Sequence, residues 1–147
     1  MTQVNAQYPS LCDRTVFITG GGSGIGAALS RAFHLQGARV AFIDIAEQPS
    51  RQLVADLEAQ TGRAPWFRLC DSRDVPSLQA AIQEAGEQLG PIRVLVNNAA
   101  RDDRHDWREV DTAYWDEGMA TNLRPMFFAI QAAAPHMIVA GGASIIN

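Results

Sequence analysis

The sequence predicts a doubly wound α/β fold, in which helices cover both faces of a parallel sheet. Two observations carry this prediction. Strand and helix patterns alternate along the chain, and the strand segments are almost continuously apolar, as in sheets buried on both faces. Right-handed crossovers between successive strands then give the order 3-2-1-4-5. With 47% hydrophobic and 19% charged residues in 147, we expect one globular domain.

The strands are expected where short β-branched and aromatic runs end at glycine or polar residues. These runs cover residues 15–19, 39–44, 65–70, 93–97 and, as a fifth strand that leaves the sheet incomplete on its carboxyl-terminal side, 143–147. Helices are expected where apolar residues recur every three or four positions. Those segments are 24–36, 53–61, 78–89 and 114–139, with Pro125 expected to kink the last one.

Composition and charge exclude several classes of protein. The net charge is −4 without any basic run, which disfavours a nucleic-acid partner. No apolar run reaches the ~20 residues of a membrane span. All twelve cations are arginine, so these residues offer neither the lysine of a Walker A phosphate loop nor that of a Schiff base. Residues 1–14 do not resemble a secretory signal and only Cys12 and Cys70 are present, so a cytoplasmic protein is expected.

The segment TGGGSGIG, residues 19–26, lies between the first strand and the first helix. Ligands of doubly wound sheets bind at the carboxyl ends of the strands. Glycines there allow the backbone to approach a pyrophosphate, whose charge meets the amino end of the helix. Asp44, 24 positions after Gly20, ends the second strand, where a carboxylate can accept the hydroxyl groups of an adenosine ribose. The sequence therefore predicts a dinucleotide site at this edge.

Two glycine patterns fit this segment. Residues 22–27 match the G-x-G-x-x-A form of long-chain dehydrogenases, and residues 19–26 match T-G-x-x-x-G-x-G. The motif NNAA at 97–100, Asp71 after the third strand and Asn122 favour the second pattern. On these motifs the chain, from about residue 9 to 147, resembles the short-chain dehydrogenase/reductase family.

The resemblance implies that residues 1–147 form an NAD-binding Rossmann domain. It assigns the cofactor phosphates and ribose to Gly20, Ser23, Gly24, Ile25 and Gly26, the adenosine ribose to Asp44, the adenine to Asp71 and Ser72, and the nicotinamide ribose to Asn98. Asn122 would help to hold a proton-relay water. Ala100 stands where the family usually has glycine, and its methyl group could crowd the cofactor if the backbone φ there is positive. Asp44 would repel a 2′-phosphate, which favours NAD over NADP.

Shorter segments resemble the NAD-dependent aldose 1-dehydrogenases of this family, of the D-xylose kind. They are YPSL at 8–11, DDRH at 102–105, YWD at 114–116 and NLR at 122–124. The resemblance implies oxidation of the anomeric hydroxyl of a sugar to a lactone. The family's catalytic serine and Tyr-x-x-x-Lys pair have no counterpart here, so we expect an inactive amino-terminal part of an enzyme that is homo-oligomeric when complete. A non-catalytic dinucleotide-binding module, or the remnant of a truncated gene, is the alternative.

The remaining polar and aromatic residues have simpler interpretations. The acidic loop 102–106, beside two arginines, is expected to be solvated and self-paired rather than a metal site. His34 and His136 are expected to be packing or surface residues, and Cys70 a small buried side chain. Core or loop anchors are expected at the three tryptophans, Trp66, Trp107 and Trp115.

Overall fold

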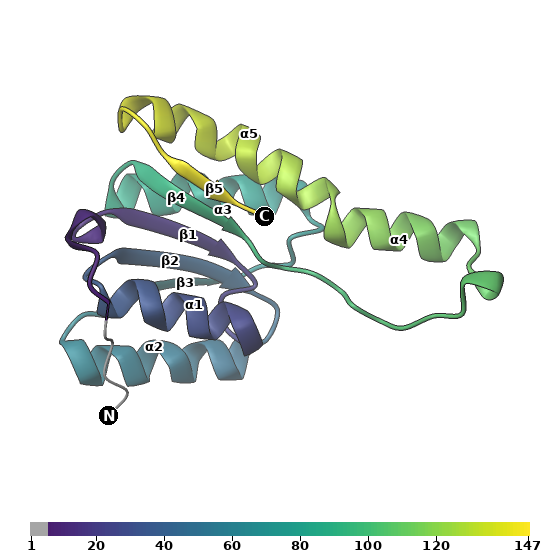
Figure 1. The fold of residues 1–147 in the computed structure, drawn as a ribbon, viewed down its shortest axis with the longest axis horizontal. Coiled ribbons are helices and arrows are strands. Elements are labelled where there is room, and N and C mark those ends of the chain that lie inside the picture. The colour runs from purple at the N-terminus through teal and green to yellow at the C-terminus, as the bar shows by residue number, and fades with distance from the viewer. Residues whose placement is uncertain (1–5) are drawn as a thin grey trace.

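The computed structural model describes residues 6–147, which form a parallel sheet between two layers of helices (Figure 1). The strands run in the order β3-β2-β1-β4-β5, as predicted, and every neighbouring pair is parallel. Their bounds are β1 (Thr15–Thr19), β2 (Arg39–Asp44), β3 (Trp66–Leu69), β4 (Ile92–Asn97) and β5 (Ser144–Ile146). The interpretation of residues 1–14 rests in part on residues 1–5, which lie outside the described residues.

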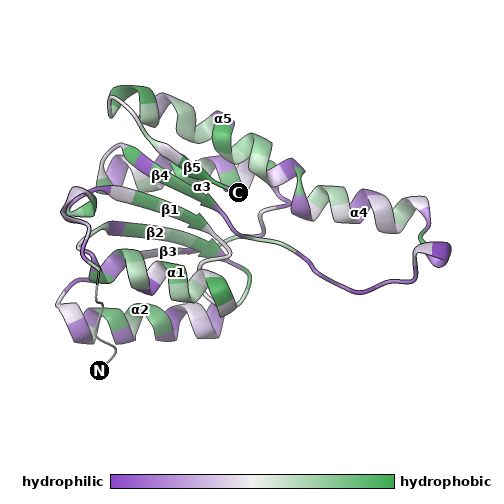
Figure 2. Ribbon diagram, viewed as in Figure 1, coloured by the Kyte–Doolittle hydropathy of each residue, from purple (hydrophilic) through white to green (hydrophobic). Residues whose placement is uncertain are grey.

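Two helices cover each face of the sheet (Figure 1). On one face lie α1 (Gly24–Leu35) and α2 (Glu47–Thr61), and on the other lie α3 (Val75–Leu89) and α5 (Arg124–Val139). Successive side chains of β1 enter different cores: Val16 and Ile18 pack under α1 and α2, whereas Phe17 packs under α3 and α5. Burial on both faces is why the strand interiors are largely apolar, and most of the strand length is hydrophobic in Figure 2.

The predicted helix 114–139 is two helices, α4 (Thr112–Asn122) and α5. They meet at Leu123, whose φ of −122° and ψ of −51° are not helical. Pro125 occupies the first turn of α5, where its missing N–H costs no helical hydrogen bond. The break predicted from Pro125 is therefore confirmed. It lets α5 cover the sheet while α4 projects beyond the carboxyl edge of the strands (Figure 1).

Several element boundaries differ from the prediction. α2 and α3 begin at Glu47 and Val75, earlier than predicted, because their first turns carry no apolar periodicity; Asp74 caps α3 by accepting from the Ser77 amide at 3.2 Å. The 3₁₀ helices η1 (Pro9–Leu11) and η2 (Trp107–Glu109) were not predicted. Within residues 6–147, no helix has both the length and the apolar character to cross a membrane.

The prediction that all three tryptophans are anchors is wrong for two of them. Trp66 packs against the core under α3 and α5, whereas Trp107 is 81% and Trp115 62% exposed. Both exposed rings lie on the segment that projects beyond the sheet, where no helical layer of residues 6–147 covers them (Figure 1). β5 is also exposed, since it pairs only with β4 at the edge of the sheet.

Candidate functional site

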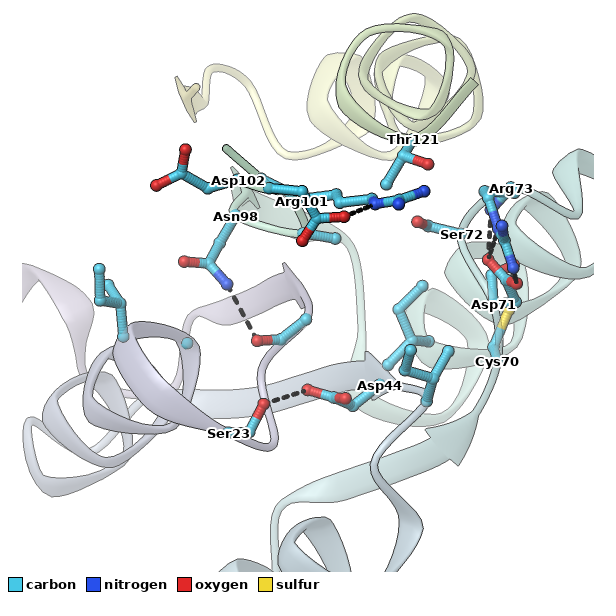
Figure 3. A pocket seen from close by; sticks show the side chains of 18 of the residues that line it. Ser23, Asp44, Cys70, Asp71, Ser72, Arg73, Asn98, Arg101, Asp102 and Thr121 are labelled. Carbon is cyan, nitrogen blue, oxygen red and sulfur yellow. Dashed lines mark hydrogen bonds and ion pairs between the residues drawn. The ribbon is translucent and has the colours of Figure 1, made fainter. Parts of the chain in front are cut away.

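A cavity of about 680 Å³ opens at the carboxyl edge of the sheet, between the glycine loop and the segments that follow β2, β3 and β4 (Figure 3). Most of the predicted site residues line it: Gly20, Ser23, Ile25, Gly26, Asp44, Asp71, Ser72 and Asn98. Gly24 and Asn122 are not among its lining residues. Arg73, Glu117 and Thr121 also line it and were not predicted, because neither their residue type nor their spacing indicates a cofactor site.

Three consecutive glycines of the loop are each held by a different side chain. The Asn98 amide donates to the Gly20 carbonyl at 2.9 Å, and the Ser30 hydroxyl donates to the Gly21 carbonyl at 2.8 Å. The Gly22 amide in turn donates to the Asp44 carboxylate at 2.8 Å. Asn98 directly follows β4, Ser30 lies in α1 and Asp44 ends β2. The glycine loop is therefore held by three different parts of the fold.

All three glycines of the T-G-x-x-x-G-x-G pattern meet a structural need. Gly20 and Gly24 have φ values of +65° and +51°, a conformation that other residues rarely adopt. Gly26 has no room for a side chain, because a Cβ there would lie 1.8 Å from the Gly20 carbonyl oxygen. At the first turn of α1, no acidic residue is present and Ser23 makes no side-chain capping bond. The amide groups of that turn are therefore available to an anion.

Asp44 is fixed in place at the end of β2, with only 6% of its surface exposed. One carboxylate oxygen accepts from the Ala46 amide at 2.8 Å; the other accepts from Gly22 and, at 3.5 Å, from the Ser23 hydroxyl. Of the ion pairs formed by residues 6–147, none includes Asp44. A negative charge that no arginine neutralises thus borders the cavity (Figure 3).

Charged side chains of alternating sign follow one rim of the cavity. Arg73 pairs with Asp71 at 2.7 Å, and this guanidinium holds the pKa of the Asp71 carboxyl below its usual value, mainly through hydrogen bonds to the side chain. Glu117, on α4, lies 3.5 Å from Arg73 and 2.7 Å from Arg101, while Arg101 also pairs with Asp103. The rim therefore connects the turns after β3 and β4 to α4.

The side chain of Asn122 binds the backbone of the segment that follows β4. Its side-chain oxygen accepts from the Arg101 amide at 2.7 Å, and its side-chain nitrogen donates to the Arg101 carbonyl at 3.0 Å. It lies directly before the break at Leu123, but its predicted role in holding a water stays a prediction. The Ala100 methyl group was expected to crowd the cofactor only if the backbone φ there were positive. That condition is not met, because Asp13 is the only non-glycine residue of the described chain with a positive φ.

The acidic loop 102–106 pairs with neighbouring arginines, as predicted: Arg101 binds Asp103, and Arg108 binds Asp106 at 2.7 Å. Among residues 6–147, no three His, Cys, Asp or Glu side chains are grouped to hold a metal ion. Cys70 is buried, as predicted. His34 is also buried; its ring Nε2 lies 2.9 Å from the Thr61 hydroxyl, and burial followed by the charge of Arg63 lowers its pKa.

Proteins of known sequence and structure resemble this chain throughout. A protein named probable galactose dehydrogenase from Rhizobium meliloti is 55% identical over all of this chain and 57% of its own length. The D-xylose 1-dehydrogenase of Caulobacter vibrioides is 48% identical over 97% of this chain and 56% of its own. The chain thus spans a little over half the length of these relatives.

Solved structures of dehydrogenases have the same fold as this chain. A dehydrogenase/reductase from Sinorhizobium meliloti 1021 superposes with a TM-score of 0.81 at 37% identity, over 86% of this chain and 50% of its own. A short chain dehydrogenase from Burkholderia cenocepacia J2315, in complex with NADP, gives 0.80 at 31% identity, over 86% of this chain and 51% of its own. The family model for short chain dehydrogenases matches residues 14–147. Nearly the whole chain therefore matches one family, and it belongs to the short-chain dehydrogenases.

Proposed function

We propose that this chain binds NAD and forms the cofactor-binding part of a dehydrogenase that oxidises an aldose at C1. The observation that carries the proposal is the pairing of the glycine loop with the fixed carboxylate of Asp44 across one cavity. The free amide groups of the first turn of α1 suit a pyrophosphate. The carboxylate, already oriented by two backbone amides, suits the diol of the adenosine ribose.

The same residues support a fuller placement of the cofactor. Gly20, Ser23, Gly24, Ile25 and Gly26 would surround the phosphates, Asp71 and Ser72 the adenine, and Asn98 the nicotinamide ribose. Bound NAD would accept a hydride from C1 of the sugar, while the hydroxyl proton passes to a base, so that a lactone and NADH form.

NAD rather than NADP is proposed because of Asp44. A 2′-phosphate on the adenosine ribose would meet its negative charge, which like-charge repulsion disfavours. Neither Ile45 nor Ala46, the next residues, offers a compensating cation. The binding test compares the dissociation constants of NAD and NADP by isothermal titration calorimetry. NADP binding as tight as NAD binding would contradict the proposed role of Asp44.

An aldose is proposed as the substrate because of the named relatives and the position of the loop 101–106. Arg101, Asp102 and Asp103 line the cavity on the side of β4, where a sugar could lie beside the nicotinamide. Aldoses, secondary alcohols and steroids can be screened with NAD by the absorbance of NADH, using the full-length enzyme. Activity with alcohols or steroids alone would exclude the sugar assignment and leave the cofactor assignment standing.

Residues 1–147 by themselves are proposed to bind the cofactor without turnover. They contain no lysine to lower the pKa of a catalytic tyrosine, the arrangement that the family resemblance implies. The same absence favours a second candidate, a dinucleotide-binding module without activity. NADH formation by the full-length protein separates the two functions. We also propose that the protein is cytoplasmic and a homo-oligomer. The exposed apolar side chains Trp115 on α4, Leu123 at the break and Phe127 on α5 support the homo-oligomer.

A further inference from the structure

Three N–H groups of Arg73 occupy most of the acceptor positions of the Asp71 carboxylate. Its Oδ1 accepts from the Arg73 backbone amide at 2.9 Å and from Arg73 Nε at 3.1 Å. Its Oδ2 accepts from Arg73 Nε at 2.9 Å and from Nη2 at 2.7 Å. A carboxylate offers about four acceptor sites. An adenine amino group that binds this carboxylate therefore competes with the Arg73 side chain for it.

Glu117 stands where it can receive that side chain. Its Oε1 lies 3.5 Å from Arg73 Nη1, and no residue in the described range 6–147 donates a hydrogen bond to its Oε2. The same Oε1 is 2.7 Å from Arg101 Nη1. Figure 3 shows the Arg101 side chain extending along the cavity toward the segment that carries Arg73, whose guanidinium lies beside Asp71. Two cations so placed need an anion between them, and Glu117 is that anion.

We propose that Glu117 is a positioning residue, which takes over Arg73 from Asp71 when an adenine nucleotide binds. The inference rests on the proposed function, because it requires that the adenine approach Asp71. The exchange is easy, since both ion pairs of Arg73 have side chains that are between a third and a half exposed, and pairs of this kind contribute little. It gives Arg73 another carboxylate partner, while Asp71 would exchange its ion pair for a hydrogen bond from the neutral adenine amino group.

The test is calorimetric titration of the protein with NAD and with AMP, which is the adenosine monophosphate half of NAD without the nicotinamide half. Glu117→Gln removes the charge and keeps the shape, so Arg73 stays on Asp71 and both ligands should bind about two- to fivefold more weakly. Asp116→Asn is the matched control, because it removes the same charge from the neighbouring position of α4, and Asp116 forms no ion pair within residues 6–147. Its affinities should equal those of the unsubstituted protein.

Arg73→Ala provides a readout that a purely structural role of Glu117 would not produce. Because it frees Asp71, it should bind AMP at least as tightly as the unsubstituted protein, and in combination with Glu117→Gln it should restore the lost affinity. An effect of Glu117→Gln no larger than that of Asp116→Asn would overturn the inference, as would a double variant as weak as Glu117→Gln alone. If the unsubstituted protein bound neither NAD nor AMP, the proposed function would fail, and this inference with it.

Discussion

Replacing Gly26 by alanine should damage the cofactor site more than any other single methyl group in the loop. The new Cβ would lie 1.8 Å from the Gly20 carbonyl oxygen and 2.7 Å from the side-chain nitrogen of Asn98. The first obstacle is a backbone atom and cannot rotate away. Gly20 cannot withdraw freely either, because its carbonyl accepts the hydrogen bond from Asn98 and its φ of +65° is already unusual.

The magnitude follows from two terms. Overpacking of this kind costs about 1–3 kcal/mol. Loss of the hydrogen bond from Asn98 adds about 0.5–1.5 kcal/mol, so the free energy of unfolding should fall by about 2–4 kcal/mol. Gly24→Ala is the matched control: its φ is +51°, but nothing lies within 4 Å of the added Cβ. The free energy of unfolding of Gly24→Ala should therefore fall only by the cost of an alanine in the left-handed conformation, about 1–2 kcal/mol.

Urea unfolding followed by circular dichroism measures both variants. With a slope of about 1–3 kcal/mol per molar urea, the Gly26→Ala midpoint should fall by roughly 1–2 M, and further than that of Gly24→Ala. NAD affinity should decrease as well, because Gly20 and Asn98 both line the cavity. A Gly26→Ala midpoint equal to or above that of Gly24→Ala would refute the reasoning from close approach.

Three further predictions concern the same fold. Asp44→Ala should weaken binding of NAD more than that of NADP, because it removes the partner of the ribose hydroxyls together with the charge that repels a 2′-phosphate. Adding Ile45→Arg should shift preference further toward NADP, and calorimetric dissociation constants unchanged by Asp44→Ala would contradict this. Ser30→Ala should weaken NAD binding, because the Ser30 hydroxyl holds the Gly21 carbonyl of the glycine loop. Thr15→Val removes a buried hydroxyl donor at the opposite end of the sheet and should leave NAD binding unchanged, so equal NAD affinities of the two variants would contradict this prediction. Because the pKa of His34 is lowered on folding from its ordinary value of 6.5, the unfolded chain takes up the proton more readily. The contribution of neutral, buried His34 to the free energy of unfolding should be fully present above pH 6.5 and should fall as the pH drops from there toward the folded pKa. Urea midpoints that do not fall more steeply with decreasing pH than those of His34→Gln would rule this out.

The sequence alone determined the fold class, the strand order and the place of the cavity at the carboxyl edge of the sheet. Each follows from local patterns and from their order along the chain. The apolar residues Val16, Phe17 and Ile18 follow one another because β1 is buried on both faces, and the loop at 19–26 follows a strand end whatever covers it. Pro125 marked the break between α4 and α5 for the same reason, since a missing N–H acts locally.

The tertiary structure decided which side chains hold the site together. Ser30 lies beneath the glycine loop, and Glu117 lies between Arg73 and Arg101, although these partners are separated along the chain and share no sequence pattern. The exposure of Trp115 was likewise settled by the packing of α5, which carries α4 beyond the sheet. Periodicity reports how one element meets the core, because burial repeats with the geometry of that element. Contacts between elements depend on how those elements pack, and no local pattern encodes that arrangement.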